Sequence, residues 1–237
     1  MYIGLGIIAV LAVFAVAEFA YIKYSGTPVA VPQISREEMT IGSGKPLRFA
    51  VLGDSTSVAQ GGEYSEGYAS GTARYLAQQH RITWKNVGVS GARAADVAAS
   101  QAAQAASFKP DIALIGVGAN DVTHLTSIDA VRASLESAIG QLQTASPDIK
   151  IILTGSPDMG SPPRIPQPLR WAAGERTKHL NAAIRSLANG QSIIFAPIAE
   201  RTGPAFRANH GLFAADKFHP NTEGYQLWTP VIIDALR

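Results

Sequence analysis

The chain of 237 residues contains no cysteine. This absence excludes disulfide bonds, thiolate metal sites and cysteine nucleophiles. It leaves the cellular compartment open, because a chain of this length can bury a core without disulfides. Any nucleophile in a catalytic site must therefore be another residue type.

The chain also has no large excess of positive or negative charge. The chain has 20 Lys and Arg against 18 Asp and Glu, which gives a net charge of +2, and no run of basic residues. Nucleic-acid binding needs a basic patch, so no nucleic-acid partner is predicted. No motif for a metal ion or a cofactor is found, and none is predicted. With 46% hydrophobic and 16% charged residues, the composition predicts one globular domain with an appendage.

The appendage begins with a long apolar run. Residues 3–22 carry a single charge, Glu18. As a helix such a run spans about 30 Å, enough for a bilayer core, so residues 1–24 predict a single-pass membrane anchor and a membrane localisation. The alternative is a signal peptide cut after Ala17, although no Lys or Arg precedes the run. By the positive-inside rule, the basic residues that follow the run place the domain in the cytoplasm. Export is the alternative, so the side of the membrane on which the domain lies is left open.

Residues 25–46 contain Pro28, Pro32 and Pro46 and three glycines. This composition indicates a linker between the anchor and a folded domain over residues 47–237.

Strand-like and helix-like patterns alternate from Leu47 onward. Strands are predicted over 47–53, 82–87, 111–117, 150–154 and 192–196, and helices over 66–80, 92–106, 128–145, 170–187 and 223–236, the last interrupted near Pro230. This alternation predicts an α/β fold with a mostly parallel sheet of about five strands and helices on both faces.

A serine follows the first predicted strand. Phe49–Gly53 leads into Asp54 and Ser55, which places a hydroxyl at the carboxyl edge of the sheet, where ligands bind in open α/β folds. Serine attacks an ester only if a base removes its proton and a third group orients that base. His219 is the candidate base, and Asp216 lies three residues before it, so a turn can bring the carboxylate and the imidazole together. Ser55, Asp216 and His219 are therefore the predicted catalytic residues.

An oxyanion requires preorganised hydrogen-bond donors. The candidates are the backbone N–H groups of Ser55 and Gly91 and the side-chain amide of Asn120, each just after a predicted strand. Alternatively, Gly91 only starts a helix and Asn120 only braces its own loop. Asp54 and Asp121 are predicted to brace loops.

Four blocks together resemble the SGNH (GDSL-type) hydrolase superfamily of esterases, lipases, thioesterases and carbohydrate acylesterases. They are Gly53-Asp54-Ser55, Ser90-Gly91 after Asn86, Gly118-Ala119-Asn120-Asp121 and Asp216-Lys217-Phe218-His219-Pro220. The resemblance implies Ser55 as nucleophile, His219 as base, Asp216 as its orienting acid, and Gly91 and Asn120 as oxyanion donors. It also implies a three-layer flavodoxin-like fold. Arg93 departs from the small or acidic residue that relatives often have.

The sequence thus predicts a membrane-tethered serine hydrolase that cleaves a carboxylic ester through an acyl-serine intermediate. The substrate is a lipid ester, a short acyl ester or an acetylated carbohydrate. One alternative is acyl transfer to a sugar or lipid hydroxyl by the same residues, and another is a catalytically silent binding domain. The Pro-rich run 155–168, with Met159 and Arg164, either lines the acyl pocket or is a rigid connection.

Overall fold

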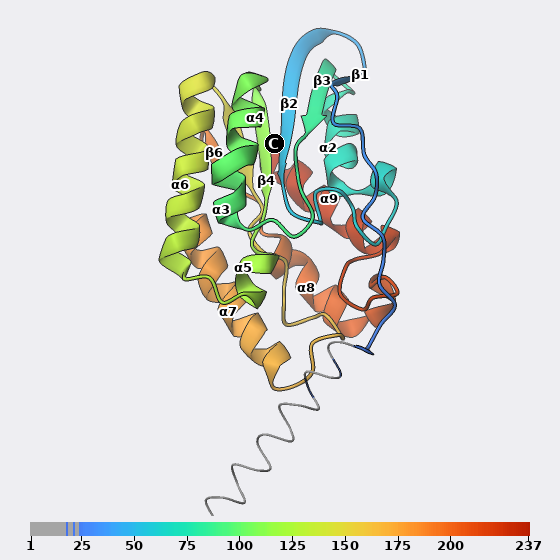
Figure 1. The fold of residues 1–237 in the computed structure, drawn as a ribbon. Coiled ribbons are helices and arrows are strands. Elements are labelled where there is room, and N and C mark those ends of the chain that lie inside the picture. The colour runs from blue at the N-terminus through green and yellow to red at the C-terminus, as the bar shows by residue number, and fades with distance from the viewer. Residues whose placement is uncertain (1–17, 19–20, 22–23) are drawn as a thin grey trace, which may run out of the picture.

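The computed structural model describes Glu18, Tyr21 and residues 24–237. Its centre is a six-stranded sheet in the order β1-β3-β2-β4-β5-β6 (Figure 1). The strands are β1 Met39–Ile41, β2 Lys45–Gly53, β3 His80–Asn86, β4 Ile112–Gly116, β5 Lys150–Leu153 and β6 Ile193–Phe195. The longer helices are α2 Tyr68–Leu76, α6 Ile128–Ala145, α7 Leu169–Arg185, α8 Ile198–Ala208 and α9 Thr222–Leu236. Shorter helical segments are η1 Tyr64–Glu66, α3 Ala94–Asp96, η2 Val97–Gln101, α4 Ala102–Ser107, α5 Ala119–Thr123 and η3 His210–Leu212.

The sheet is covered on both faces because its central strands are apolar on both. In β2, Phe49 and Val51 pack in a core with α2, α8 and α9, whereas Ala50 and Leu52 pack in a second core with α3, α4, α6 and α7. Figure 1 shows α4 and α6 on one side of the sheet and α2 and α9 on the other. The result is the three-layer arrangement of helix, sheet and helix.

Five of the strands, β2 to β6, pair in parallel, and in the sheet β2 lies between β3 and β4. Counted along the chain, these parallel strands lie in the order 2-1-3-4-5. This is the flavodoxin-like order, and its topological switch point lies between the first and third parallel strands. Here those strands are β2 and β4, so their carboxyl ends mark the expected ligand site.

The predicted sheet of about five strands is wrong by one strand. Met39–Ile41, within the segment predicted to be a linker, adds β1 antiparallel to β3 at the sheet edge. Three residues are too few for the alternation of apolar and polar residues that identifies a strand in sequence. The tertiary contact with β3 therefore decides its structure.

The helices of the structure also differ from the predicted ones. The helices α5 and α8 were not predicted. The helix predicted over 92–106 is present as a continuous helical segment over 94–107, but a π-helical turn, η2, lies between α3 and α4. The last helix continues through Pro230 without the predicted interruption. Trp228, Val231 and Ile232 on either side of Pro230 are buried in the core, and this packing holds α9 together.

The prediction of a single-pass membrane anchor, and of a membrane localisation, is contradicted. Among Glu18, Tyr21 and residues 24–237, no helix has both the length and the apolar character needed to cross a bilayer. The apolar run behind the prediction falls mainly on residues 1–17, 19–20 and 22–23, which lie outside the described residues. Length and hydropathy were the whole basis of the prediction, and apolar composition alone does not establish a spanning helix.

Leu114 lies at the middle of β4 and is fully buried. Leu114→Ala is expected to lower the free energy of unfolding by about 2–5 kcal/mol, because it removes buried methyl groups and leaves a cavity. Urea denaturation measures the loss. Leu125→Ala is the control, since Leu125 is 74% exposed, and its stability should stay within about 0.5 kcal/mol. Equal effects of the two substitutions would contradict the burial described for β4.

Candidate active site

Ser55 lies in a tight turn at the carboxyl end of β2. The turn is closed by hydrogen bonds from Ser57 N to Asp54 O at 3.1 Å and from Gln60 N to Ser55 O at 3.0 Å. Beside it, Gly53 pairs with Gly116 at the end of β4. The turn therefore lies at the switch point of the sheet.

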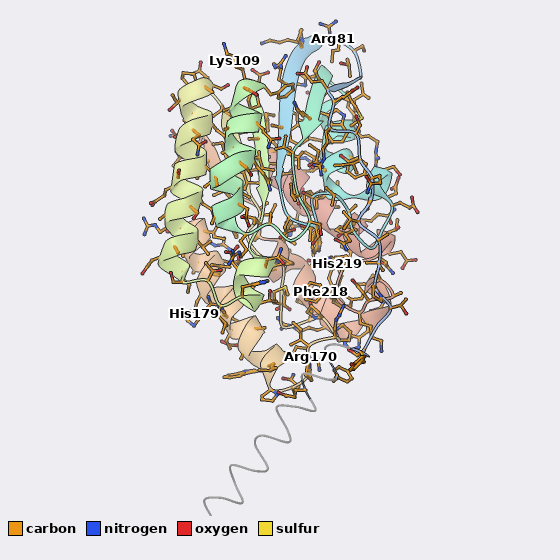
Figure 2. All side chains as sticks on the ribbon, viewed as in Figure 1. Arg81, Lys109, Arg170, His179, Phe218 and His219 are labelled. Atoms are coloured by element: carbon orange, nitrogen blue, oxygen red, sulfur yellow. The ribbon has the colours of Figure 1, made fainter. Side chains whose placement is uncertain are left out.

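His219 and Asp216 come from the loop before α9. Asp216 Oδ1 accepts hydrogen bonds from the backbone N–H groups of Phe218 and His219, both at 3.0 Å. Its Oδ2 lies 2.6 Å from His219 Nδ1, and His219 Nε2 lies 2.9 Å from Ser55 Oγ. The structure thus joins the three predicted residues in one hydrogen-bonded chain. In Figure 2, His219 and Phe218 lie in the lower middle of the molecule, between Arg81 and Lys109 at the top and Arg170 at the bottom.

Asp216 is held in its ionised form. Burial acts to raise the pKa of its carboxyl, but the hydrogen bond and positive charge of His219 and the two backbone N–H groups outweigh burial. The net pKa lies below the usual value for an aspartate. An ionised Asp216 keeps the proton of His219 on Nδ1 and leaves Nε2 to face Ser55.

Asn120 lies in α5, directly after β4. Its Nδ2 donates a hydrogen bond to Ala92 O at 3.0 Å, which connects α5 to the loop after β3. Gly91 lies in that loop with φ of +83°, and the position beside it is open. Asn120 borders the cavity beside Ser55, whereas Gly91 does not. Of these two predicted donors, Gly91 thus lies in the loop after β3 and Asn120 in the short helix after β4.

The cavity beside Ser55 and His219 is narrow and mostly apolar. Its walls come from the loops after β2 and β5, from α5, α8 and α9, and from the His219 loop. The residues are Ser55, Thr56, Ala119, Asn120, Pro157, Asp158, Met159, Ser161, Pro162, Thr202, Gly203, Phe206, Phe213, Phe218, His219, Pro220 and Trp228. The run 155–168 reaches the cavity through five of these residues. It is also joined to the His219 loop by a hydrogen bond from Arg164 N to Lys217 O at 3.1 Å.

No role was predicted from the sequence for two buried amide side chains that hold the serine turn, although Asn86 was named in the second of the four blocks. Gln101 accepts from Gly53 N at 2.7 Å and donates to Gly53 O at 3.0 Å. Asn86 donates to Ser57 O at 2.8 Å and accepts from Gly88 N at 2.9 Å. The signal for Gln101 was its polar side chain in an Ala-rich helix, and the signal for Asn86 was its position at a strand end.

Two carboxyl groups are buried close to the turn. Asp54 Oδ1 accepts hydrogen bonds from the N–H and hydroxyl of Thr56 at 2.9 and 2.8 Å, while its Oδ2 has no hydrogen-bond partner. Asp121 Oδ2 accepts from Ala94 N at 3.0 Å. Burial raises the pKa of Asp54 to about 6 and raises that of Asp121 as well.

Across the described part of the chain, no group of three or more histidine and carboxylate side chains is placed to hold a metal ion.

Sequence comparison relates this site to known proteins. Residues 51–227 match the model of the GDSL-like lipase/acylhydrolase family. A GDSL-like esterase of Mycobacterium tuberculosis is 32% identical over 197 residues, which cover 81% of this chain and 62% of the relative. The chain therefore spans about three fifths of the length of that curated relative.

Solved structures show the same fold at low sequence identity. A catalytic mutant of an acetylxylan esterase from Geobacillus stearothermophilus matches with a TM-score of 0.65 and 19% identity, over 84% of this chain and 96% of that one. A lipase from a goat rumen metagenome matches with a TM-score of 0.65 and 15% identity, over 80% and 97%. These structures show the fold alone, whereas the match of residues 51–227 to the family model confirms the resemblance seen in the four sequence blocks. The chain belongs to the GDSL-like lipase/acylhydrolase family.

Proposed function

We propose that this protein hydrolyses a carboxylic ester through an acyl-serine intermediate, with Ser55 as nucleophile, His219 as base and Asp216 as the group that orients the base. The observation that carries the proposal is the unbroken chain of hydrogen bonds from Asp216 Oδ2 through His219 to Ser55 Oγ, at 2.6 and 2.9 Å. Such distances allow proton transfer, which is the first requirement for a general base.

The proposed reaction has two halves. In the first, His219 Nε2 takes the proton of Ser55 Oγ as the oxygen attacks the ester carbonyl, and then gives that proton to the departing alcohol. In the second, His219 removes a proton from water, the resulting oxygen attacks the acyl group, and Ser55 recovers its proton as the carboxylic acid leaves. Asp216 stabilises the imidazolium that forms in each half.

The oxyanion in this reaction is assigned to three donors: the N–H groups of Ser55 and Gly91 and one N–H of Asn120. Asn120 Nδ2 carries two hydrogens, and the bond to Ala92 O uses one of them. That bond fixes the orientation of the amide, so the second hydrogen is available to the cavity that Asn120 borders.

Ser55→Ala is expected to leave a folded protein with ester hydrolysis near background. His219→Ala should cost about as much, and the double variant little more, because members of one catalytic unit are not additive. Hydrolysis of p-nitrophenyl acetate measures activity, and reaction with a fluorophosphonate probe measures the nucleophile directly. His124→Ala is the matched control, since His124 is exposed and borders no part of the cavity. Probe labelling of the Ser55→Ala variant would exclude Ser55 as the nucleophile.

Asn120→Ala is expected to reduce kcat by roughly 10²–10³-fold with little change in KM, because the negative charge on the carbonyl oxygen develops only in the transition state. The same variant also loses the hydrogen bond to Ala92 O, so its thermal unfolding must be followed beside its kinetics. A lower Tm with unchanged kcat would mean that Asn120 only braces the loop.

The raised pKa of Asp54 has a consequence for stability. Between pH 4 and 6 the folded chain keeps a proton on Asp54 that the unfolded chain releases, so this group makes the folded state less stable as the pH rises through that range. Full ionisation costs about 2–3 kcal/mol at neutral pH, judged from the size of the shift.

Asp54→Asn should therefore stabilise the protein at pH 7 by about 2–3 kcal/mol and change little at pH 4. The asparagine oxygen keeps the two hydrogen bonds from Thr56. Urea unfolding at both pH values measures the difference. Asp216→Asn is the control of opposite sign. The pKa of Asp216 is lower in the folded chain, so its carboxylate stabilises the folded state at pH values above the pKa it has in the unfolded chain, and this contribution is lost as the pH falls. Asp216→Asn should therefore destabilise the protein at pH 7. An equal effect of Asp54→Asn at both pH values would refute the shift.

A further inference from the structure

An ion pair forms one wall of the cavity beside Ser55. Asp158, in the loop between β5 and α7, has a side chain that is 6% exposed. Its Oδ2 accepts a hydrogen bond from Nε of Arg207 on α8 at 2.7 Å and lies 2.6 Å from Nη2 of the same guanidinium in an ion pair. Its Oδ1 accepts from Gly160 N at 3.0 Å. The carboxylate is therefore fixed on both of its oxygens.

Asp158 borders two cavities at once. One is the cavity that contains Ser55 and His219, with a volume of about 30 Å³. The other lies between α7 and α8, has a volume of about 260 Å³ and is bordered by Arg207. Arg207 does not border the first cavity. The ion pair thus separates a small cavity at the reacting groups from a larger one behind it.

Close packing keeps this wall in place. A Cβ on Gly203 of α8 would lie 2.9 Å from Asp158 Oδ2, so only glycine allows the helix to approach the carboxylate. On the other side, a Cβ on Gly174 of α7 would lie 3.1 Å from the Cα of Gly160. Asp158 is therefore held between two helices and has little room to move.

The size of the small cavity limits what it can hold. A water molecule needs roughly 10–15 Å³ of such volume, so the cavity holds the equivalent of about two waters. An acetyl or propionyl tail has this size, and the apolar side chains of Met159, Phe206 and Phe213 suit it. We propose that the Asp158–Arg207 ion pair closes the acyl cavity and restricts the enzyme to esters of short acyl groups. This inference rests on the proposed acyl-serine mechanism.

A second groove lies nearby and offers a rival place for a long acyl chain. It has a volume of about 530 Å³, and its apolar lining includes Leu125, Ile165 and Leu169. Phe218 borders both the groove and the small cavity, but Ser55 and His219 border only the small cavity. An acyl carbon bonded to Ser55 Oγ therefore begins in the small cavity, which favours the ion pair as the limit on chain length.

The test compares kcat/KM for p-nitrophenyl octanoate with kcat/KM for p-nitrophenyl acetate. In the Asp158→Ala/Arg207→Ala variant the two cavities should become continuous. The octanoate-to-acetate ratio of kcat/KM should then rise at least tenfold, because even one methylene in an apolar pocket changes kcat/KM by about tenfold. Removing both partners also avoids leaving a buried charge unpaired. Asp158→Ala alone should shift the ratio in the same direction, because Asp158 borders both cavities. The Arg207 side chain that it leaves is 53% exposed and can be solvated, so this variant decides the question if the double variant does not fold.

Arg201→Ala is the matched control. Arg201 lies on the same helix, but its ion pair is with Asp234, and it borders neither cavity. Its ratio should equal that of the unmodified protein. An unchanged ratio in a folded Asp158 and Arg207 variant overturns the inference. A rise in the octanoate-to-acetate ratio that only Leu169→Ala produces would also overturn it, because Leu169 lines the larger apolar groove. Loss of the proposed mechanism would look different, because Ser55→Ala would then still hydrolyse both esters.

Discussion

The close approach of β2 and β4 at the carboxyl edge of the sheet is the constraint on which the site depends. A Cβ on Gly53 would lie 2.2 Å from Gly116 O, and a Cβ on Gly116 would lie 2.2 Å from the hydroxyl oxygen of Tyr68. Glycine is therefore required at the end of both strands. This contact places the turn of Ser55 beside α5, which carries Asn120, and Gln101 then fixes the backbone of Gly53 from the opposite helical layer.

The loop that carries Asp216 and His219 reaches Ser55 because α9 is anchored. Asn221 caps the start of α9 by accepting from Gly224 N, and the buried hydroxyl of Tyr225 donates to Gln60 O at 2.8 Å. Gln60 belongs to the same turn as Ser55, through its hydrogen bond to Ser55 O. The packing of one helix thus positions two segments that are 164 residues apart in the chain.

The extended segment before β1 contacts the same loops from outside. Thr27 N donates to Ala215 O at 2.9 Å, next to Asp216, and Gln60 Nε2 donates to Val29 O at 3.2 Å. Arg36 donates to the carbonyl oxygens of Asn86 and Gly88, in the loop that leads to Gly91. Residues whose composition suggests only a linker therefore pack against each of the three loops at the edge of the sheet.

The sequence by itself determined what depends on neighbours along the chain. The apolar strands, the turn at Ser55 and the Asp216–His219 pair, three residues apart, all follow from local pattern, and together with Asn120 they identified the family. Local pattern also misled, since apolar composition suggested a membrane anchor and the short β1 left no periodic signal. Only the tertiary structure decided the contact of His219 with Ser55, the clamp of Gln101 on Gly53 and the ion pair of Asp158 with Arg207, because partners 48 or more residues apart meet only when helices and sheet pack into one core.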